Sequence, residues 1–254
     1  MEVVFVGVGE ACDERLPNTA LLVRTEAAGT RRSLLLDCGF TAACRYWRHT
    51  DDADELDALW ISHFHGDHFF GIPVLLLRFW EMKRHKPLLL LGQSGLQKVV
   101  ETTMDLAYPN FRRKLEYPLE FVEFDTDQPM ALLGLTWQTA ENEHSQRSLA
   151  IRIDNGPESL FYSGDGRPTR ETLDLARHCQ VIVHEAFRLT GDTSGHGTVQ
   201  GCLELARAAR CETLALVHVQ RDERRDRLRD IVQLVDGVQE FHALLPEPDD
   251  IHEW

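Results

Sequence analysis

Apolar runs bounded by turn residues open the chain and predict a group of β-strands. The first three runs contain mostly Val, Leu and Phe: E-V-V-F-V-G-V from Glu2, T-A-L-L-V-R-T at Thr19–Thr25 and R-S-L-L-L-D-C from Arg32. Gly, Pro, Asn and charged residues separate them, which predicts strands connected by hairpins. A fourth run, A-L-W-I-S from Ala58, predicts a buried strand that ends at a cluster of histidines.

Helical periodicity first appears after these histidines, and helices and strands then follow one another to the end of the chain. Helices are predicted in F-F-G-I-P-V-L-L-L-R-F-W-E-M-K-R and at Gly95–Tyr108, Pro168–His178 and Thr198–Arg210. Further strands are predicted at Leu88–Gly92, near Phe121, at Leu132–Thr139 and in S-L-A-I-R-I, S-L-F-Y-S-G, C-Q-V-I-V-H and T-L-A-L-V-H-V. The charged stretch Gln220–Arg229 predicts a solvated helix face. We expect an α/β fold in which two sheets lie between helical layers.

No repeat, low-complexity tract or flexible linker divides the chain, so we expect residues 1–254 to form a single domain. The 254 residues are 43% hydrophobic and 27% charged, which excludes disordered and fibrous proteins. No stretch approaches the roughly 18 consecutive apolar residues of a membrane span, and Glu2 stands where a signal peptide is positive. The six cysteines form no C-x-x-C pair, so we expect reduced thiols in a cytoplasmic protein without membrane contact.

The net charge narrows the range of partners. Lys and Arg total 27 and Asp and Glu total 41, so the formal net charge is −14. This charge repels a polyanion over long range, which argues against a general nucleic-acid binder. The 12 histidines exceed what packing or solubility requires, and they point to bound metal ions.

The sequence H-F-H-G-D-H at residues 63–68 is the strongest chemical signal in the chain. His63 and His65 are two residues apart on an extended backbone, so both side chains can point the same way and bind one cation. Asp67 and His68 follow the turn at Gly66 and can reach a second cation. This spacing predicts two adjacent metal ions.

Two metal ions need further ligands, and three candidates follow predicted strands. His144 comes shortly after the run that ends at Thr139, Asp165 comes after S-L-F-Y-S-G, and His218 ends T-L-A-L-V-H. Loops above a rigid sheet hold a site in place, which favours residues at strand ends. A carboxylate can bridge two cations roughly 3.5 to 4 Å apart. We therefore expect His144 on the first ion, His218 on the second, and Asp165 between them.

These motifs resemble a known superfamily over nearly the whole chain. H-x-H-x-D-H, the isolated histidine, S-G-D after a strand and the late strand-end histidine resemble the metallo-β-lactamase fold superfamily. Within it, H-G-D-H-F-F-G-I-P, Y-S-G-D-G-R-P, V-I-V-H-E-A-F, G-H-G-T and L-V-H are similar to motifs of ribonuclease Z. The resemblance implies a four-layered αβ/βα sandwich, two zinc ions on these ligands and, because such proteins often dimerise, a homodimer. Imidazole and carboxylate donors also suit Mn²⁺ or iron.

The resemblance further implies a hydrolase that cleaves phosphodiester bonds with a water activated by both metal ions. Asp67 is expected to orient or deprotonate that water. The place of His196 in S-G-H-G-T implies a proton donor to the leaving oxygen, not a metal ligand. Glu185 in V-H-E-A is a candidate to orient His196 by a hydrogen bond, whereas His184 points to the opposite strand face and is expected to be structural.

Two departures from ribonuclease Z bear on the substrate. That family inserts a long arm that grips tRNA near the segment between His144 and Asp165, where this chain has only S-Q-R-S-L-A-I-R-I-D-N-G-P-E-S-L-F-Y-S-G. Arg221 also follows His218 by three residues where the family has four. With the charge of −14, these departures make a small phosphodiester, such as a cyclic nucleotide or cyclic phosphoribosyl compound, competitive with precursor tRNA.

Two basic clusters partly offset this argument, because either could hold substrate phosphates. They are Arg78, Lys83, Arg84 and Lys86, and Arg112, Arg113 and Lys114. Their other interpretation is solvated charge at helix ends and in loops. The alternative function is an ester, thioester or lactone hydrolase on the same fold, and a more distant one is a metal-binding protein without catalysis.

Overall fold

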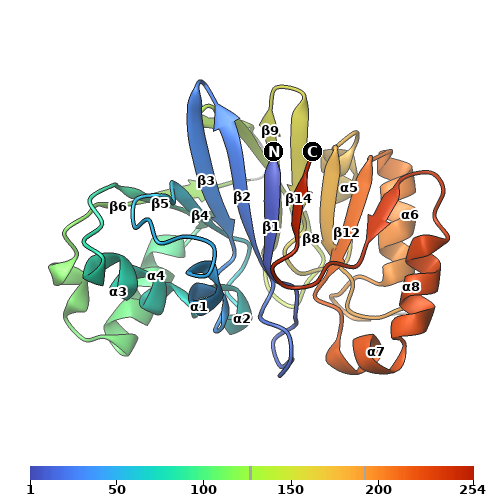
Figure 1. The fold of residues 1–254 in the computed structure, drawn as a ribbon, viewed down its shortest axis with the longest axis horizontal. Helices are drawn as coiled ribbons and strands as arrows, with labels where there is room; N and C mark the ends of the chain where they lie inside the picture. The colour runs from blue at the N-terminus through green and yellow to red at the C-terminus, as the bar shows by residue number, and fades with distance from the viewer. Residues whose placement is uncertain (126–127, 192) are drawn as a thin grey trace.

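Two seven-stranded β-sheets lie face to face, with helices on their outer surfaces (Figure 1). The computed structural model describes residues 1–125, 128–191 and 193–254. In Figure 1, helices α1–α4 lie on one outer side of the paired sheets and α5, α6 and α8 on the other. The αβ/βα sandwich predicted from the sequence is therefore confirmed.

The first sheet has the strand order β14-β1-β2-β3-β4-β5-β6. Its strands β14 to β3 are antiparallel, and β3 to β6 are parallel. The strands are β1 (Glu2–Gly7), β2 (Ala20–Ala27), β3 (Thr30–Leu36), β4 (Ala58–Ile61), β5 (Leu88–Gln93), β6 (Leu119–Phe124) and β14 (Ile251–Glu253).

The second sheet has the order β13-β12-β11-β10-β9-β8-β7. It repeats the plan of the first, because β7 to β10 are antiparallel and β10 to β13 are parallel. The strands are β7 (Met130–Leu132), β8 (Leu135–Asn142), β9 (Ser148–Asn155), β10 (Glu158–Tyr162), β11 (Val181–Glu185), β12 (Thr213–Val217) and β13 (His242–Leu244).

Helices connect the parallel strands, and several begin at the signals that the sequence offers. Thr169 and Thr198 accept a backbone hydrogen bond at the start of α5 and α6, as N-cap threonines do. Pro73 lies in the first turn of α3, where a missing N–H costs nothing. The helices are α1 (Ala42–Tyr46), α2 (Gly66–Phe69), α3 (Ile72–Glu81), α4 (Leu96–Ala107), the 3₁₀ helix η1 (Phe111–Lys114), α5 (Arg170–Ala176), α6 (Val199–Ala209), α7 (Arg221–Asp226) and α8 (Leu228–Asp236).

Both faces of the inner strands are buried. Val3 and Phe5 of β1 belong to the cluster between the two sheets, while Val4 and Val6 pack under the helices of the first half. This explains the nearly continuous apolar run at the N-terminus, since a strand covered on both faces shows little polar alternation.

Three details differ from the sequence-based expectation. The strand predicted at Leu132–Thr139 is interrupted by a turn at Leu133 and Gly134, where both residues have positive φ, so β7 and β8 form a hairpin. The stretch Gln220–Arg229 contains α7 and the start of α8, and its Arg224 is buried, donating to the carbonyl of Pro246. The short elements α1, β13 and β14 were not predicted.

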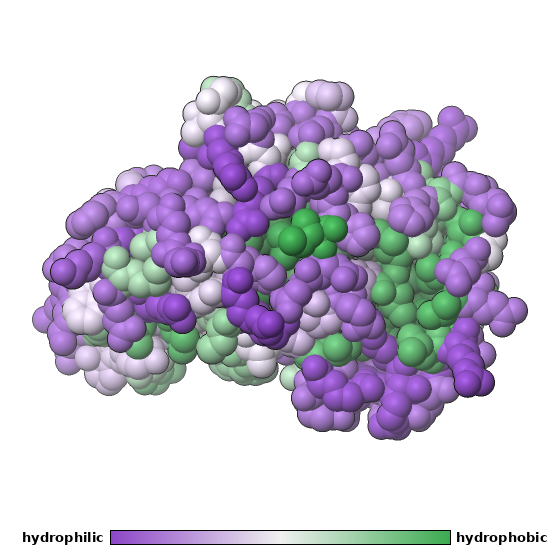
Figure 2. Space-filling model, in the orientation of Figure 1, coloured by the Kyte–Doolittle hydropathy of each residue, from purple (hydrophilic) through white to green (hydrophobic). Residues whose placement is uncertain are grey.

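The molecular surface agrees with the composition. The face in Figure 2 is mainly hydrophilic, with an apolar area on the right of the view, over the C-terminal helices. On α8, Leu228, Val232 and Leu234 are exposed. Among the helices in the described ranges, none is long and apolar enough to cross a membrane.

Candidate metal centre

The loops that follow strands of both sheets meet at one end of the sandwich and bring seven histidine and aspartate side chains together. The first half supplies the loop after β4, and the second half supplies the residues after β8, β10 and β12. All seven residues predicted as metal ligands lie in two groups that share Asp165. The groups are His63, His65, His144 and Asp165, and Asp67, His68, Asp165 and His218.

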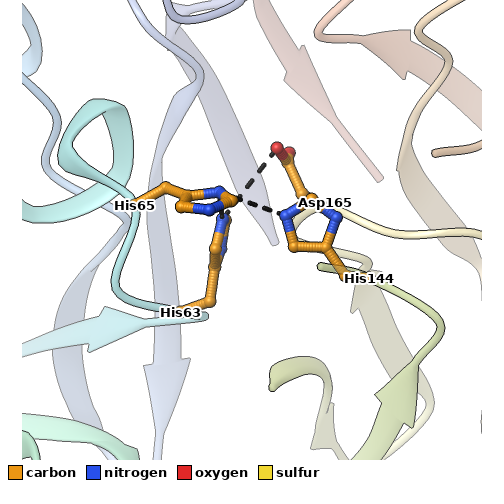
Figure 3. Close-up of side chains that lie close together, drawn as sticks. All are labelled: His63, His65, His144 and Asp165. Carbon is orange, nitrogen blue, oxygen red and sulfur yellow. Dashed lines mark hydrogen bonds and ion pairs between the residues drawn. The ribbon is translucent and has the colours of Figure 1, made fainter. Parts of the chain in front are cut away.

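In the first group, three imidazole nitrogens converge (Figure 3). Nδ1 of His65 lies 3.1 Å from Nε2 of His63 and 3.1 Å from Nε2 of His144. The Asp165 carboxylate faces the same point, with Oδ2 4.0 Å from Nε2 of His63. Three imidazoles and one carboxylate around a point form a donor set that suits a transition-metal cation.

The second group is more deeply buried and contains two carboxylates. Nε2 of His68 lies 3.3 Å from Oδ2 of Asp67 and 3.3 Å from Oδ1 of Asp165. Nε2 of His218 lies 3.3 Å from Oδ2 of Asp67 and 3.4 Å from Oδ2 of Asp165. The two oxygens of Asp165 thus face both groups, as a bridging carboxylate requires.

Two buried polar atoms test whether this arrangement suits cations. Nε2 of His68 and Oδ1 of Asp165 are both buried, and no residue in the described part of the chain forms a hydrogen bond with either atom. A buried polar atom without a partner is costly, so such atoms are rare in native proteins. A cation between these atoms would satisfy both, and the residues therefore fit a dinuclear metal site.

A layer beneath the ligands turns their free nitrogens toward the centre. Asp37, at the end of β3, is fully buried and accepts hydrogen bonds from Nδ1 of His68 at 2.7 Å and from the hydroxyls of Ser62 and Tyr162 at 2.8 and 2.7 Å. Oγ of Ser62 lies 3.0 Å from Nδ1 of His63 and accepts from it. Such partners set the tautomer and orientation of ligating imidazoles.

Asp37 was missed in the sequence, although, like Asp165, it is an aspartate that follows an apolar run. His144 has a comparable partner that no pattern indicates, because its Nδ1 donates to the backbone carbonyl of Gly195 at 2.6 Å.

The pKa values of several side chains in the two groups are shifted by burial and by neighbouring charges. Burial lowers the pKa of His63, and the neighbouring histidines add to the effect, so its imidazole is neutral. Burial alone would raise the pKa of Asp165, but the positive charges of His218 and His68 outweigh it and lower the pKa well below the usual value. For His218 the carboxylates of Asp165 and Asp67 outweigh burial and raise its pKa to about 9. A proton there occupies the place that a metal ion would take.

His196 stands beside both groups. Its ring centroid lies 4.9 Å from that of His144 and 6.1 Å from that of His218. Nδ1 of His196 donates to Oε1 of Glu185 at 3.2 Å, which leaves Nε2 free. Burial alone would lower the pKa of His196, but the hydrogen bond and charge of Glu185 outweigh it and raise the pKa. A histidine with a raised pKa beside a reaction centre is suited to donate a proton.

Glu185 is almost fully buried, and it accepts hydrogen bonds from other residues besides His196. Its Oε1 also accepts from the backbone N–H of Gly166 at 3.0 Å and of Gly197 at 2.8 Å. The adjacent His184 lies elsewhere, buried with its ring near that of Phe161.

The first basic cluster is largely structural. Arg84 is buried and donates to the backbone carbonyls of Ala53, Leu56, Lys86 and Pro87, so it is not available for substrate phosphates. The guanidinium of Arg78 lies over the ring of Trp47, and Lys86 is paired with Asp57 at 3.1 Å.

The second basic cluster is partly neutralised. Arg112 forms ion pairs with Glu101 at 3.2 Å and with Asp105 at 2.7 Å. The ammonium of Lys114 lies over the ring of Phe111. Both clusters therefore offer less positive charge than the sequence suggests.

Comparisons with known proteins agree with the geometry. Residues 1–241 match the family described as anti-Pycsar protein Apyc1. Ribonuclease BN of Escherichia coli is 25% identical, with 86% of this chain and 89% of that protein covered. Ribonuclease Z of Staphylococcus haemolyticus is 23% identical, with 92% and 93% covered. The predicted resemblance to ribonuclease Z is thus confirmed.

Solved structures share the fold over the full length. The metallo-β-lactamase fold protein YhfI from Bacillus subtilis superposes with a TM-score of 0.79 at 20% identity, over 99% of this chain and 98% of that one. The short form of human tRNase Z gives a TM-score of 0.77 at 20% identity, over 100% and 99%. At these identities the match establishes the metallo-β-lactamase fold.

Proposed function

The chain belongs to the family of the anti-Pycsar protein Apyc1, and we propose that this metal-dependent hydrolase uses two zinc ions to cleave a small cyclic phosphodiester. The observation that carries the proposal is the arrangement of seven donors in two groups that share Asp165, whose carboxylate faces both groups. Imidazole and carboxylate donors fit zinc, and Mn²⁺ or iron are the alternatives that metal analysis would distinguish.

In the proposed site, His63, His65 and His144 would hold one ion, Asp67, His68 and His218 would hold the other, and Asp165 would be shared between them. Bound ions in such a site lower the pKa of a water toward 7 and neutralise charge on the phosphoryl oxygens. The chain supplies the remaining steps. Asp67 orients the attacking water and accepts its proton, and Nε2 of His196 donates a proton to the leaving oxygen. Glu185 holds Nδ1 of His196 and so directs Nε2.

Four observations favour a small substrate over RNA. The connection from β8 to β9, between Asn142 and Ser148, is too short to hold an arm. The basic clusters are partly occupied by structural contacts, and the net charge is −14. The alignment with ribonuclease BN also spans 275 positions while covering 86% of this chain, so that relative carries residues that this chain lacks.

The test is metal analysis of the purified protein followed by parallel assays on a 3′,5′-cyclic nucleotide, precursor tRNA, and a panel of lactones and thioesters. We expect two equivalents of metal and turnover of the cyclic nucleotide only. Efficient cleavage of precursor tRNA would show that the missing arm does not decide the substrate. Turnover of a lactone or thioester alone would replace the phosphodiesterase with the alternative hydrolase, and no turnover by the fully metallated protein would indicate a non-catalytic metal protein.

We also propose that the chain forms a homodimer in the cytoplasm. All six cysteines, which lie in the described ranges, are free thiols, in keeping with a reducing compartment. Phe40, Phe70 and Val74 lie on or beside the metal-binding loop and its helix and are 40 to 53% exposed, as apolar residues at a subunit contact would be in a single copy. The mass in solution tests the dimer, and F70D is expected to yield monomers.

A further inference from the structure

We propose that Phe187 is a positioning residue that holds the imidazole of His196 in the orientation for proton donation. The inference rests on the proposed function, since it concerns the residue that protonates the leaving group there. Phe187 lies in the loop after β11, two residues after Glu185, and its side chain is partly buried.

The rings of Phe187 and His196 are stacked. Their centroids lie 4.5 Å apart and their planes are inclined by only 21°. Phe187 also approaches the ring of His218, with centroids 6.1 Å apart. Its phenyl ring therefore forms a flat wall along one face of His196, next to the proposed metal centre.

The backbone holds this wall in place on two sides. The N–H of Phe187 donates to Oε2 of Glu185 at 3.0 Å, while Oε1 of the same carboxylate accepts from His196. The carbonyl of Phe187 accepts from the N–H of Gln220 at 2.9 Å, two residues after His218. Phe187 is thus tied to the hydrogen-bond partner of His196 and to the strand end that carries a proposed ligand.

A flat wall has a specific effect on an imidazole. The torsion that rotates a histidine ring about its Cβ–Cγ bond is broad, so a single hydrogen bond at Nδ1 leaves the ring free to tilt. Stacking restricts that tilt and is a favourable contact in its own right. Small misplacements of a catalytic group lower the rate strongly. The stacked ring should therefore raise the fraction of enzyme–substrate complexes in which Nε2 of His196 is within reach of the leaving oxygen.

The test separates proton donation from stability by the leaving group of the substrate. Hydrolysis of a 3′,5′-cyclic nucleotide expels an alkoxide that needs a proton, whereas bis(p-nitrophenyl) phosphate expels a stable phenolate that does not. We expect F187A to lower kcat about tenfold on the cyclic nucleotide and less than about twofold on the aryl ester, with KM and metal content unchanged. F187Y, which keeps a flat ring, should restore activity, and F187L should not.

A double variant makes the inference sharper. Once His196 is replaced by alanine, Phe187 has no ring to position, so F187A/H196A should be no slower than H196A. The matched control is F121A, which removes another partly buried phenylalanine on β6, away from the site, and should leave both activities unchanged.

Three outcomes would overturn the inference: equal losses by F187A on the two substrates, full activity of F187L on the cyclic nucleotide, or further slowing of H196A by F187A. If F187A does not fold, F187L and F187Y still allow the comparison, because both keep a large, mainly apolar side chain at this position. A wild-type protein that hydrolyses neither substrate would instead refute the proposed function.

Discussion

The two halves of the molecule contribute to the metal centre in different ways, although their sheets share one plan. The first half presents His63, His65, Asp67 and His68 in a single loop after β4. The second half presents one residue after each of several strands, with long segments between them. A local motif can therefore be recognised in the sequence. The dispersed set is brought together only when β8, β10 and β12, which run in the same direction, place their carboxyl ends at one end of the second sheet.

Asp165 is the point where the halves depend on each other most, and replacing it should have the largest effect. In Asp165→Asn, one of the two facing carboxylate oxygens becomes an amide, so we expect weakened binding of both ions and a loss of turnover of at least about 10³-fold. In His144→Ala, only the first group is broken, and we expect one ion to remain. Metal analysis and kcat on the cyclic nucleotide measure both.

Asp154→Asn serves as the control, because Asp154 lies on β9 in the same sheet and pairs with Arg152. It should retain both ions and full activity. Two tightly bound ions in Asp165→Asn would mean that each group holds its ion without the shared carboxylate.

Replacing Arg84 tests whether this residue stabilises the first half of the molecule or binds substrate. Arg84→Met leaves four backbone carbonyls without their donor, so we expect the free energy of unfolding to fall by about 3 kcal/mol. Its kcat/KM should remain unchanged, because Arg84 is buried away from substrate. Chemical denaturation measures the first quantity and steady-state kinetics the second.

Lys83→Met, which removes the same charge from an exposed neighbour, should alter neither quantity. A large rise in KM for Arg84→Met without a loss of stability would indicate that the first basic cluster does bind substrate phosphates.

Asp37 should show a smaller effect, confined to metal affinity. Asn cannot accept all the hydrogen bonds that Asp37 receives from His68, Ser62 and Tyr162, so the His68 ring loses its orientation. We expect Asp37→Asn to weaken metal binding about 10- to 100-fold, measured by competition with a chelator. Asp57, just before β4, is another buried carboxylate, and it accepts hydrogen bonds from Ser33 and Arg32. Asp57→Asn should lower the free energy of unfolding without weakening metal binding. Equal metal affinity in the two variants would contradict the role of Asp37.

The fold was predictable because its signals are local. The apolar runs of β1 to β5 and the caps at Thr169 and Thr198 show in short windows of sequence. The break at Leu133 and Gly134 did not show, because a leucine with positive φ gives no warning in an apolar run. Strands of three residues, such as β13 and β14, are too short for any periodicity.

The candidate site was predictable where a side chain and its neighbours in sequence act together. The contacts of Asp37 with Ser62, and those of Arg84 with Ala53 and Leu56, were not predictable, because these partners lie more than two dozen residues away in the sequence. A pattern of polar and apolar residues does not distinguish a buried arginine that holds a loop from an exposed one that awaits a phosphate.

The single carboxylate of Glu185 has a consequence for how this centre can change. Its Oε1 joins Gly166, next to Asp165, to His196 and Gly197. The separation between Asp165, the proposed bridging ligand, and His196, the proposed proton donor, is therefore set by the length of one side chain. A substrate that needs a wider or narrower span between its phosphorus and its leaving oxygen cannot be accommodated by altering either loop alone. Redesign of this enzyme for such a substrate must begin at Glu185, although in the proposed mechanism Glu185 contacts neither the phosphorus nor the leaving oxygen.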